Sequence, residues 1–318
     1  MRSIAHIYQS HPDDGTERRI GAYLIKTSFQ GTMITGAMFL TGMAANPLAV
    51  NLAGDLGVDI SWSLWALAAV LPGFLSLLCV PWILYKLYPP EIKETPEAAQ
   101  LADKELSRMG PMSRQEYVML FTFLLLLFLW VFGHVFSMHS ATAAFVGLVI
   151  LLVSGVLSWD DVLNEKGAWN TLVWFSALVM MASFLNILGL IPWFGETVGL
   201  LLTGLPWMTA FLFLSLIYFY SHYFFASSTA HVSSMYLPFL TVALSVQTPP
   251  IVAALVLAFF SNLYGSLTHY SMGPAPVMFG AGFVKMGDWW KIGGALSLVN
   301  ILIWLVAGGV WWKIIGLW

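Results

Sequence analysis

The densest group of hydroxyl side chains within an apolar part of this sequence is Ser227, Ser228 and Thr229. Hydroxyls at the start of a helix donate hydrogen bonds to carboxylate oxygens, and the helix dipole also favours a negative charge there. The three residues therefore predict a site for an organic anion. Two alternatives stay open, because hydroxyls in membrane helices also bond back to carbonyls one turn earlier, and small residues pack helices together.

Three histidines, His222, His231 and His269, lie in the same charge-free half of the chain. Three imidazoles can ligate a metal or a haem. No carboxylate occurs from Thr197 to Val284 to orient such ligands, so we expect no metal site. His231 adjoins the hydroxyls and is a candidate contact for the anion. His222 is more typical of a core histidine with a hydrogen-bond partner.

The acidic residues and the single cysteine do not indicate covalent catalysis. Asp160, Asp161, Glu165 and Glu196 fall in expected loops, so no buried pair of carboxylates and no nucleophile with its base can be assembled. Cys79 is the only cysteine, which excludes an internal disulfide and a cysteine-based metal centre. We expect no catalytic residues, no metal and no enzyme activity.

Two clusters of helix-breaking residues lie inside apolar runs, at Thr41–Ala49 (TGMAANPLA) and Thr268–Gly280 (THYSMGPAPVMFG). Irregular backbone at membrane depth is tolerated only where it lines a cavity or is buried in protein. Broken helices in matching parts of a chain indicate a transporter site, where helix ends face an anion and loosened carbonyls hold a cation. Ordinary proline kinks in a packed bundle are the alternative.

The composition is that of an integral membrane protein. The 318 residues are 59% hydrophobic and 9% charged, whereas about a quarter of the residues of a soluble domain are charged. No Asp, Glu, Lys or Arg occurs from Tyr117 to Trp159 or from Thr197 to Val284. The net charge of −3 and the lack of a basic tract exclude a nucleic-acid partner and leave membrane lipids as the surroundings.

The expected fold class is all-α, with seven spans and one re-entrant helical hairpin. Apolar runs long enough to cross about 30 Å of hydrocarbon cover residues 27–53, 62–85, 117–136, 140–157, 170–190, 249–283 and 292–312. The apolar segment 207–240 is interrupted by Ala226–His231 (ASSTAH), and its second arm is too short for a span. We therefore interpret it as the hairpin.

The basic residues predict the orientation. With the amino terminus in the cytoplasm and a re-entrant hairpin, every Lys and Arg except Lys313 falls on the cytoplasmic side. The hydrophilic linker 89–116 then lies in the cytoplasm, where its apolar residues predict a short amphipathic helix on the membrane surface. The predicted location is a cell membrane, as a multi-pass protein of a bacterial inner membrane.

Four motifs resemble the divalent anion:Na⁺ symporter family, in its citrate/succinate, tartrate/succinate and 2-oxoglutarate/malate exchanger branch. They are GMAANPLA at 42–49, YPPEIKETPEAAQLADKELSRMGPMS at 88–113, FFASSTAHVSSMYLPF at 224–239 and SLTHYSMGPAPVMFGAGF at 266–283. The resemblance implies secondary transport of di- or tricarboxylates such as citrate, succinate, malate, tartrate or 2-oxoglutarate. It also implies an elevator motion, a homodimer when the protein is full length, and Na⁺ as the candidate coupling ion.

The resemblance assigns residues as well. The implied substrate contacts are Ser227, Ser228, Thr229, His231, Thr268, Ser271, Met272, Gly273 and Pro274. The implied cation site comprises Ala226, Ser271, Gly42, Met43, Ala44 and Asn46. Ser228 stands where many relatives have Asn and Met272 where Thr is common, which fits an exchanger better than a strict Na⁺ symporter.

The motif order predicts three segments. Residues 1–88 would be the trailing part of a first inverted repeat, 89–116 the linker, and 117–318 a complete second repeat. That repeat would comprise scaffold spans 117–190, hairpin 207–240, broken helix 249–283 and last span 289–316. No hairpin tip precedes the first break at the spacing of the second, so we expect a carboxyl-terminal portion that does not transport alone. A transporter remnant and a membrane metal or haem protein are the competing interpretations.

Overall fold

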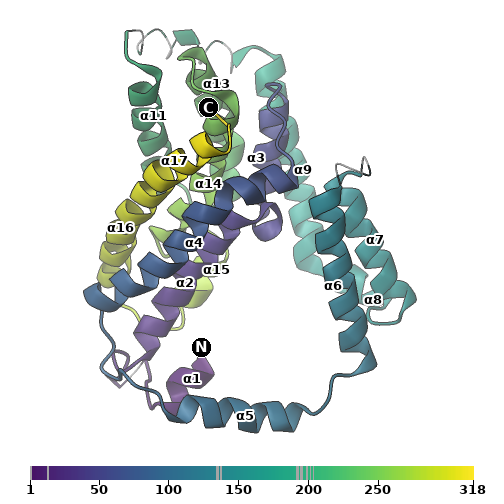
Figure 1. Ribbon diagram of the computed structural model, residues 1–318, viewed down its shortest axis with the longest axis vertical. Helices are drawn as coiled ribbons and strands as arrows, with labels where there is room; N and C mark the ends of the chain where they lie inside the picture. Colours follow the sequence, from purple (N-terminus) through teal and green to yellow (C-terminus); the bar gives the residue numbers. More distant parts are fainter. Residues whose placement is uncertain are drawn as a thin grey trace. The chain divides into compact units, whose positions relative to one another are not determined.

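The computed structural model describes residues 2–12, 14–133, 136, 138–190, 193, 196–197, 200, 202 and 204–318. Within these ranges every regular element is a helix (Figure 1). The chain divides into two compact units. Unit 1 comprises Met1–Ile60, Leu64–Glu91 and Phe175–Trp318, and unit 2 comprises Ser61–Ser63 and Ile92–Trp174.

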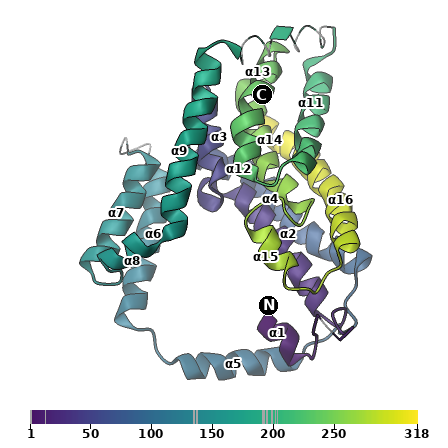
Figure 2. The same cartoon turned by 180° about the vertical axis from the view of Figure 1, so that it is seen from behind.

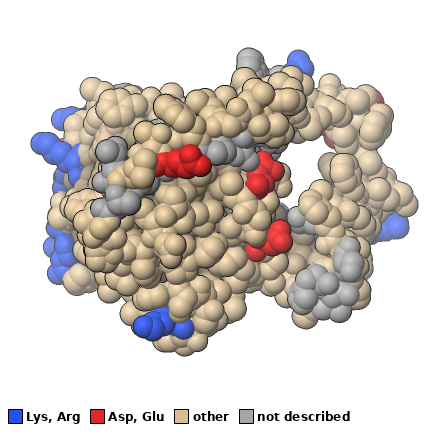
Figure 3. Space-filling view, turned by 90° about the horizontal axis from the view of Figure 1, so that it is seen from above, with Lys and Arg blue, Asp and Glu red and all other residues tan. Residues whose placement is uncertain are grey.

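Three helices in the described ranges are long and apolar enough to cross a membrane: Trp62–Leu87, Arg114–Phe132 and Met286–Ile314. Shorter apolar helices accompany them, and the face seen in Figure 3 exposes few acidic or basic side chains. The prediction of an all-α membrane protein is thereby confirmed. The count of seven spans and the re-entrant course of the hairpin stay predictions.

The first break of unit 1 separates helix α2 (Gly21–Met38) from helix α3 (Ala45–Gly54). Phe39 and Met43 have extended backbones on either side of the short 3-10 turn η1 (Leu40–Gly42). Pro47 lies in the first turn of α3, where its missing N–H costs nothing. The irregular backbone is therefore shorter than the segment Thr41–Ala49 that we expected.

The second break follows helix α14 (Pro250–Leu263) and the 3-10 turn η4 (Tyr264–Ser266), and it ends where α15 (Pro274–Phe279) begins. The Ser271 hydroxyl donates hydrogen bonds to the carbonyls of Gly265 and Thr268. Carbonyls released from the helix thus find a donor within the break. Proline at the start of α15 sets the backbone for a new helix.

The predicted hairpin segment forms two helical arms that both pack on α14. The first arm is α11 (Trp207–Ser221) with the 3-10 turn η2 (His222–Phe224), and the second is α12 (Ser228–His231), the π-helical η3 (Val232–Tyr236) and α13 (Leu237–Ser245) (Figure 2). Ser227 caps the second arm by accepting a hydrogen bond from the Ala230 N–H at 3.3 Å. The hydroxyl cluster consequently lies at the turn between the arms.

Helix α4 (Trp62–Leu87) contains Pro72, which leaves the carbonyl of Ala68 without its helical N–H donor. The indole of Trp312 donates to that carbonyl at 2.8 Å. Trp312 belongs to α17 (Gly308–Ile314), which continues α16 (Met286–Leu302) through the π-helical η5 (Ile303–Ala307). The last helix therefore completes the hydrogen bonding of α4.

Unit 2 contains α5 (Glu97–Met109), α6 (Arg114–Phe132), α7 (Ser140–Val153) and α8 (Trp159–Asn164), and α9 (Lys166–Ile187) begins in it. The remaining short helix, α1 (Arg2–Ile7), belongs to unit 1. The linker forms a helix as expected, with Leu106 and Met109 exposed. The side chains of Leu101 and Ala102, on which its apolar face was predicted, lie outside the described residues.

Candidate functional site

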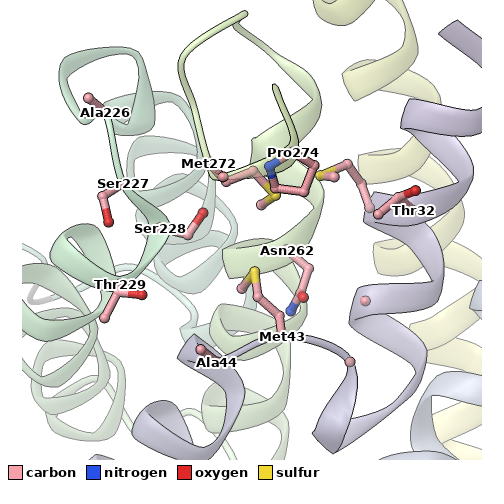
Figure 4. Close-up of a pocket in the computed structure, with 14 residues that line it drawn as sticks. Thr32, Met43, Ala44, Ala226, Ser227, Ser228, Thr229, Asn262, Met272 and Pro274 are labelled. Carbon is pink, nitrogen blue, oxygen red and sulfur yellow. The ribbon is translucent and has the colours of Figure 1, made fainter. Parts of the chain in front are cut away.

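A cavity of about 310 Å³ lies within unit 1, at the point where both breaks meet the hairpin turn (Figure 4). Its size is at the lower end of ligand pockets. It is lined by Thr32, Met33, Gly36, Gly42, Met43, Ala44, Ala226, Ser227, Ser228, Thr229, Asn262, Met272, Gly273 and Pro274. Three segments far apart in the sequence, residues 32–44, 226–229 and 262–274, therefore form one site.

The hydroxyl cluster makes one wall of this cavity. The Ser228 side chain is 4% exposed, and its hydroxyl has no hydrogen-bond partner in the described chain. Figure 4 shows this hydroxyl pointing toward the space between the cavity walls. A buried hydroxyl without a partner costs free energy, so an unfilled hydrogen bond at this point indicates a place for a ligand or a water.

The two breaks make the other walls. Gly42, Met43 and Ala44 contribute the first, and Met272, Gly273 and Pro274 the second. The methionines give these walls an apolar, deformable surface, which suits the hydrocarbon part of a small anion. The structure brings together ten residues that the sequence named in advance, from both the substrate list and the cation list.

Asn262 is a cavity residue that the sequence analysis missed. Its side-chain amide donates to the side-chain oxygen of Asn46 at 2.7 Å and to the backbone carbonyl of Ala258 at 3.1 Å. Asn46 in turn donates to the carbonyls of Gly36 and Phe39 at 2.9 and 3.1 Å. The two asparagines therefore link α14 to the first break, and the side-chain oxygen of Asn262 remains without a partner.

Helix α2 supplies Thr32, Met33 and Gly36, which the sequence analysis also missed. A β-carbon on Gly36 would lie 3.0 Å from the Asn262 side-chain oxygen, so this position admits little more than glycine. The signal for Asn262 was available, because it follows a run of apolar residues from Pro250 to Phe260. Thr32 is one of several hydroxyl residues of α2, so its sequence position gives no comparable signal.

Four other predicted residues lie behind the cavity walls. His231, Thr268 and Ser271 are fully buried and do not line the cavity, and Asn46 reaches it only through Asn262. His231 shares a hydrogen bond of 2.9 Å with the Ser221 hydroxyl, which ties the two hairpin arms together. A direct contact of these four residues with substrate or cation stays a prediction.

None of the described residues that line the cavity is acidic or basic, so hydroxyls, one carboxamide and backbone groups are the means of binding that they offer. Such groups bind a carboxylate by hydrogen bonds and by the dipole at a helix start. Within the described part of the chain no group of three His, Cys, Asp or Glu side chains could hold a metal ion. The arrangement is suited to reversible binding.

Comparison with known proteins places the chain among transporters. A sequence model of the family described as "Sodium:sulfate symporter transmembrane region" matches residues 1–318. YflS of Bacillus subtilis carries the provisional name of malate transporter. It is 54% identical over 100% of this chain and 67% of its own length. Dicarboxylate transporter 1 of Arabidopsis thaliana chloroplasts is 50% identical over 100% of this chain and 58% of its own.

The inner membrane protein YbhI of Escherichia coli is 35% identical over 99% of this chain and 66% of its own length. The chain thus spans between about half and two thirds of the relatives that it matches. The resemblance inferred from the four motifs is confirmed by the match along the whole sequence. The chain belongs to the sodium:sulfate symporter transmembrane family.

Proposed function

We propose that this chain forms the substrate-binding part of a secondary transporter that exchanges dicarboxylates across a membrane. The observation that supports this most directly is the uncharged, hydroxyl-lined cavity at which both breaks meet the hairpin turn. Ser228 presents an unfilled hydrogen bond there. The plant relatives are named dicarboxylate transporters, which gives the anion its class.

The proposed mechanism needs no covalent step. The carboxylate oxygens of the substrate accept hydrogen bonds from Ser227, Ser228 and Thr229, while Met43 and Met272 contact its carbon chain. Displacement of the site relative to the membrane, as an elevator within a homodimer, then exposes the cavity to the other side. Hairpin 207–240 and the broken helix 249–283 would move with the cavity, and the spans from 117 to 190 would stay fixed.

Sodium is the candidate coupling ion, because the family description names it. The proposed cation ligands are Ala226, Ser271, Gly42, Met43, Ala44 and Asn46. In Asn46 the amide N–H groups donate to two backbone carbonyls, and the oxygen accepts from Asn262. We favour exchange over strict Na⁺ symport, since these contacts already occupy the best oxygen ligand of the set.

Exchange in liposomes tests the proposal, using the protein as its genome encodes it, with any residues upstream of Met1. Vesicles loaded with succinate should take up labelled succinate or malate, and external Na⁺ should change the rate little. Ser228→Ala should weaken apparent substrate affinity by about 1–3 kcal/mol, the cost of an unmet hydrogen bond to a charged group.

Ser234→Ala is the matched control. The Ser234 hydroxyl is exposed and donates to the Ala230 carbonyl at 2.8 Å within the same arm, away from the cavity lining. Its loss should leave affinity unchanged. Equal affinity of the wild type and Ser228→Ala would remove Ser228 from the site, and absence of exchange by the wild type would refute dicarboxylate transport.

A further inference from the structure

Lys26 is the only Lys, Arg, Asp or Glu that is buried among the described residues. It is fully enclosed near the start of α2. Its ammonium group lies 3.3 Å from the Trp289 carbonyl oxygen and 4.0 Å from the centre of the Trp289 ring. No acidic side chain of the described chain pairs with it. The ammonium also lies 5.7 Å from the centre of the Phe29 ring. One carbonyl and two aromatic faces are incomplete compensation for a buried charge.

The neighbours of Lys26 also lack partners. Gln30 lies one turn further along the same face of α2, is fully buried, and has no hydrogen bond to either atom of its amide. The indole N–H of Trp289 is likewise buried and unpaired. A cluster this incompletely satisfied destabilises the fold, so its presence calls for a functional explanation.

This cluster leads to the cavity. Lys26, Gln30 and Met33 follow one another at helical spacing on the buried face of α2, and Met33 lines the cavity. Seven residues of helix place Lys26 roughly 10 Å from Met33 along the helix axis. The cavity walls themselves bear no charge, so a dianion inside them has no cation in contact.

We propose that the Lys26 ammonium is the through-space counter-charge of the site and sets its preference for doubly over singly charged anions. The proposal rests on the proposed function, since it assumes that the cavity binds a dicarboxylate. Attraction between unit charges about 10–15 Å apart, which allows for side-chain lengths beyond the axial separation, favours each unit of substrate charge roughly tenfold at an effective dielectric constant of about 20. Hydrogen bonds at the hairpin turn then position a substrate that Lys26 selects by charge.

The experiment compares succinate with succinamate, which has a similar shape and one charge less. Binding and exchange are measured in the protein as encoded, for the wild type, Lys26→Met, Lys26→Gln and Lys26→Arg. The two neutral variants should lose affinity for succinate roughly tenfold more than for succinamate. Lys26→Arg should keep the wild-type preference. Lys291→Met removes an exposed charge near the start of α16, two residues from Trp289, and should change the affinity for neither ligand.

Thermal stability separates this function from a structural role. Removal of an incompletely paired buried charge should leave the melting temperature of Lys26→Met unchanged or raised, while charge selectivity falls. An equal loss of affinity for both ligands, or a lowered melting temperature with unchanged charge selectivity, would overturn the assignment of Lys26. A wild type that binds neither ligand would refute the proposed function instead, and the assignment of Lys26 with it.

Discussion

Helices α14 and α6 have similar apolar sequences and opposite surroundings. Every residue of α14 from Val252 to Leu263 is buried, whereas only Thr122 of α6 is buried within unit 2. Their polar residues differ too: α14 ends in Ser261 and Asn262, which bond to the Tyr218 hydroxyl and to Asn46. Apolar composition brings both helices into a membrane, and interior polar contacts distinguish the helix that supports a site.

The strongest test of this comparison removes one aromatic ring from each helix. Phe259 of α14 is fully buried, with ring centres of Trp65 and Trp304 at 5.1 and 4.8 Å. Phe259→Ala should cost about 3–5 kcal/mol of unfolding free energy, because the cavity cannot close. Denaturant unfolding in detergent measures it. Phe121→Ala in α6, where the ring is 60% exposed, should cost under about 1 kcal/mol. Similar losses of unfolding free energy in the two variants would show that another surface covers Phe121 in the folded protein.

A smaller effect is expected where α16 touches the second break. A β-carbon at Gly293 would lie 2.6 Å from the Ser266 carbonyl oxygen and 2.7 Å from that of Leu267. Gly293→Ala should therefore lower stability by about 1–3 kcal/mol, because backbone must move. Its neighbour Gly294 has nothing nearer than the Tyr223 hydroxyl at 3.9 Å, so Gly294→Ala is the control and should be neutral or stabilising. If thermal unfolding shows that Gly293→Ala leaves stability unchanged, the backbone of this break can shift at little cost.

The smallest effect concerns pH at α8 in unit 2. Hydrogen bonds from the backbone N–H and hydroxyl of Ser158 hold the pKa of Asp161 below its usual value of 3.8. The stabilisation is thus present above that pH and is lost as pH falls through the lowered pKa. Hydrogen exchange of the α8 amides should accelerate relative to neighbours only below about pH 4. Asp161→Asn removes the titrating group and should remove this pH dependence, and an unaltered profile in that variant would exclude the contact between Asp161 and Ser158 as its source.

Much of the site was predictable from local chemistry, since proline, glycine and hydroxyl residues mark breaks and turns in any apolar helix. Residues 42–44, 227–229, 273 and 274 lie in segments that such residues mark, and all line the cavity. Thr32 and Asn262 lie outside those segments, and their positions depend on which helix faces come together. Sequence patterns also placed His231 beside the hydroxyls without showing that its ring pairs with Ser221 on the other arm.

The fold shows the same division. Helices and their breaks follow from apolar length and from Pro and Gly positions, and the linker helix follows from its amphipathic pattern. The break near Pro47 was expected to be longer than it is, because a proline in the first turn of a helix looks in sequence like one that ends a helix. The burial of each helix could not be predicted from its own sequence, since α6 and α14 differ in contacts that lie outside either segment.

The bond between Trp312 and Ala68 joins residues separated by 244 positions. At a translation rate of about 5–20 residues per second, α4 is made tens of seconds before the indole that satisfies its freed carbonyl exists. During biosynthesis α4 is therefore an unfinished helix, whose carbonyl needs water or a neighbouring protein as a temporary donor. Membrane insertion of unit 1 thus includes a helix whose hydrogen bonding only a much later helix completes.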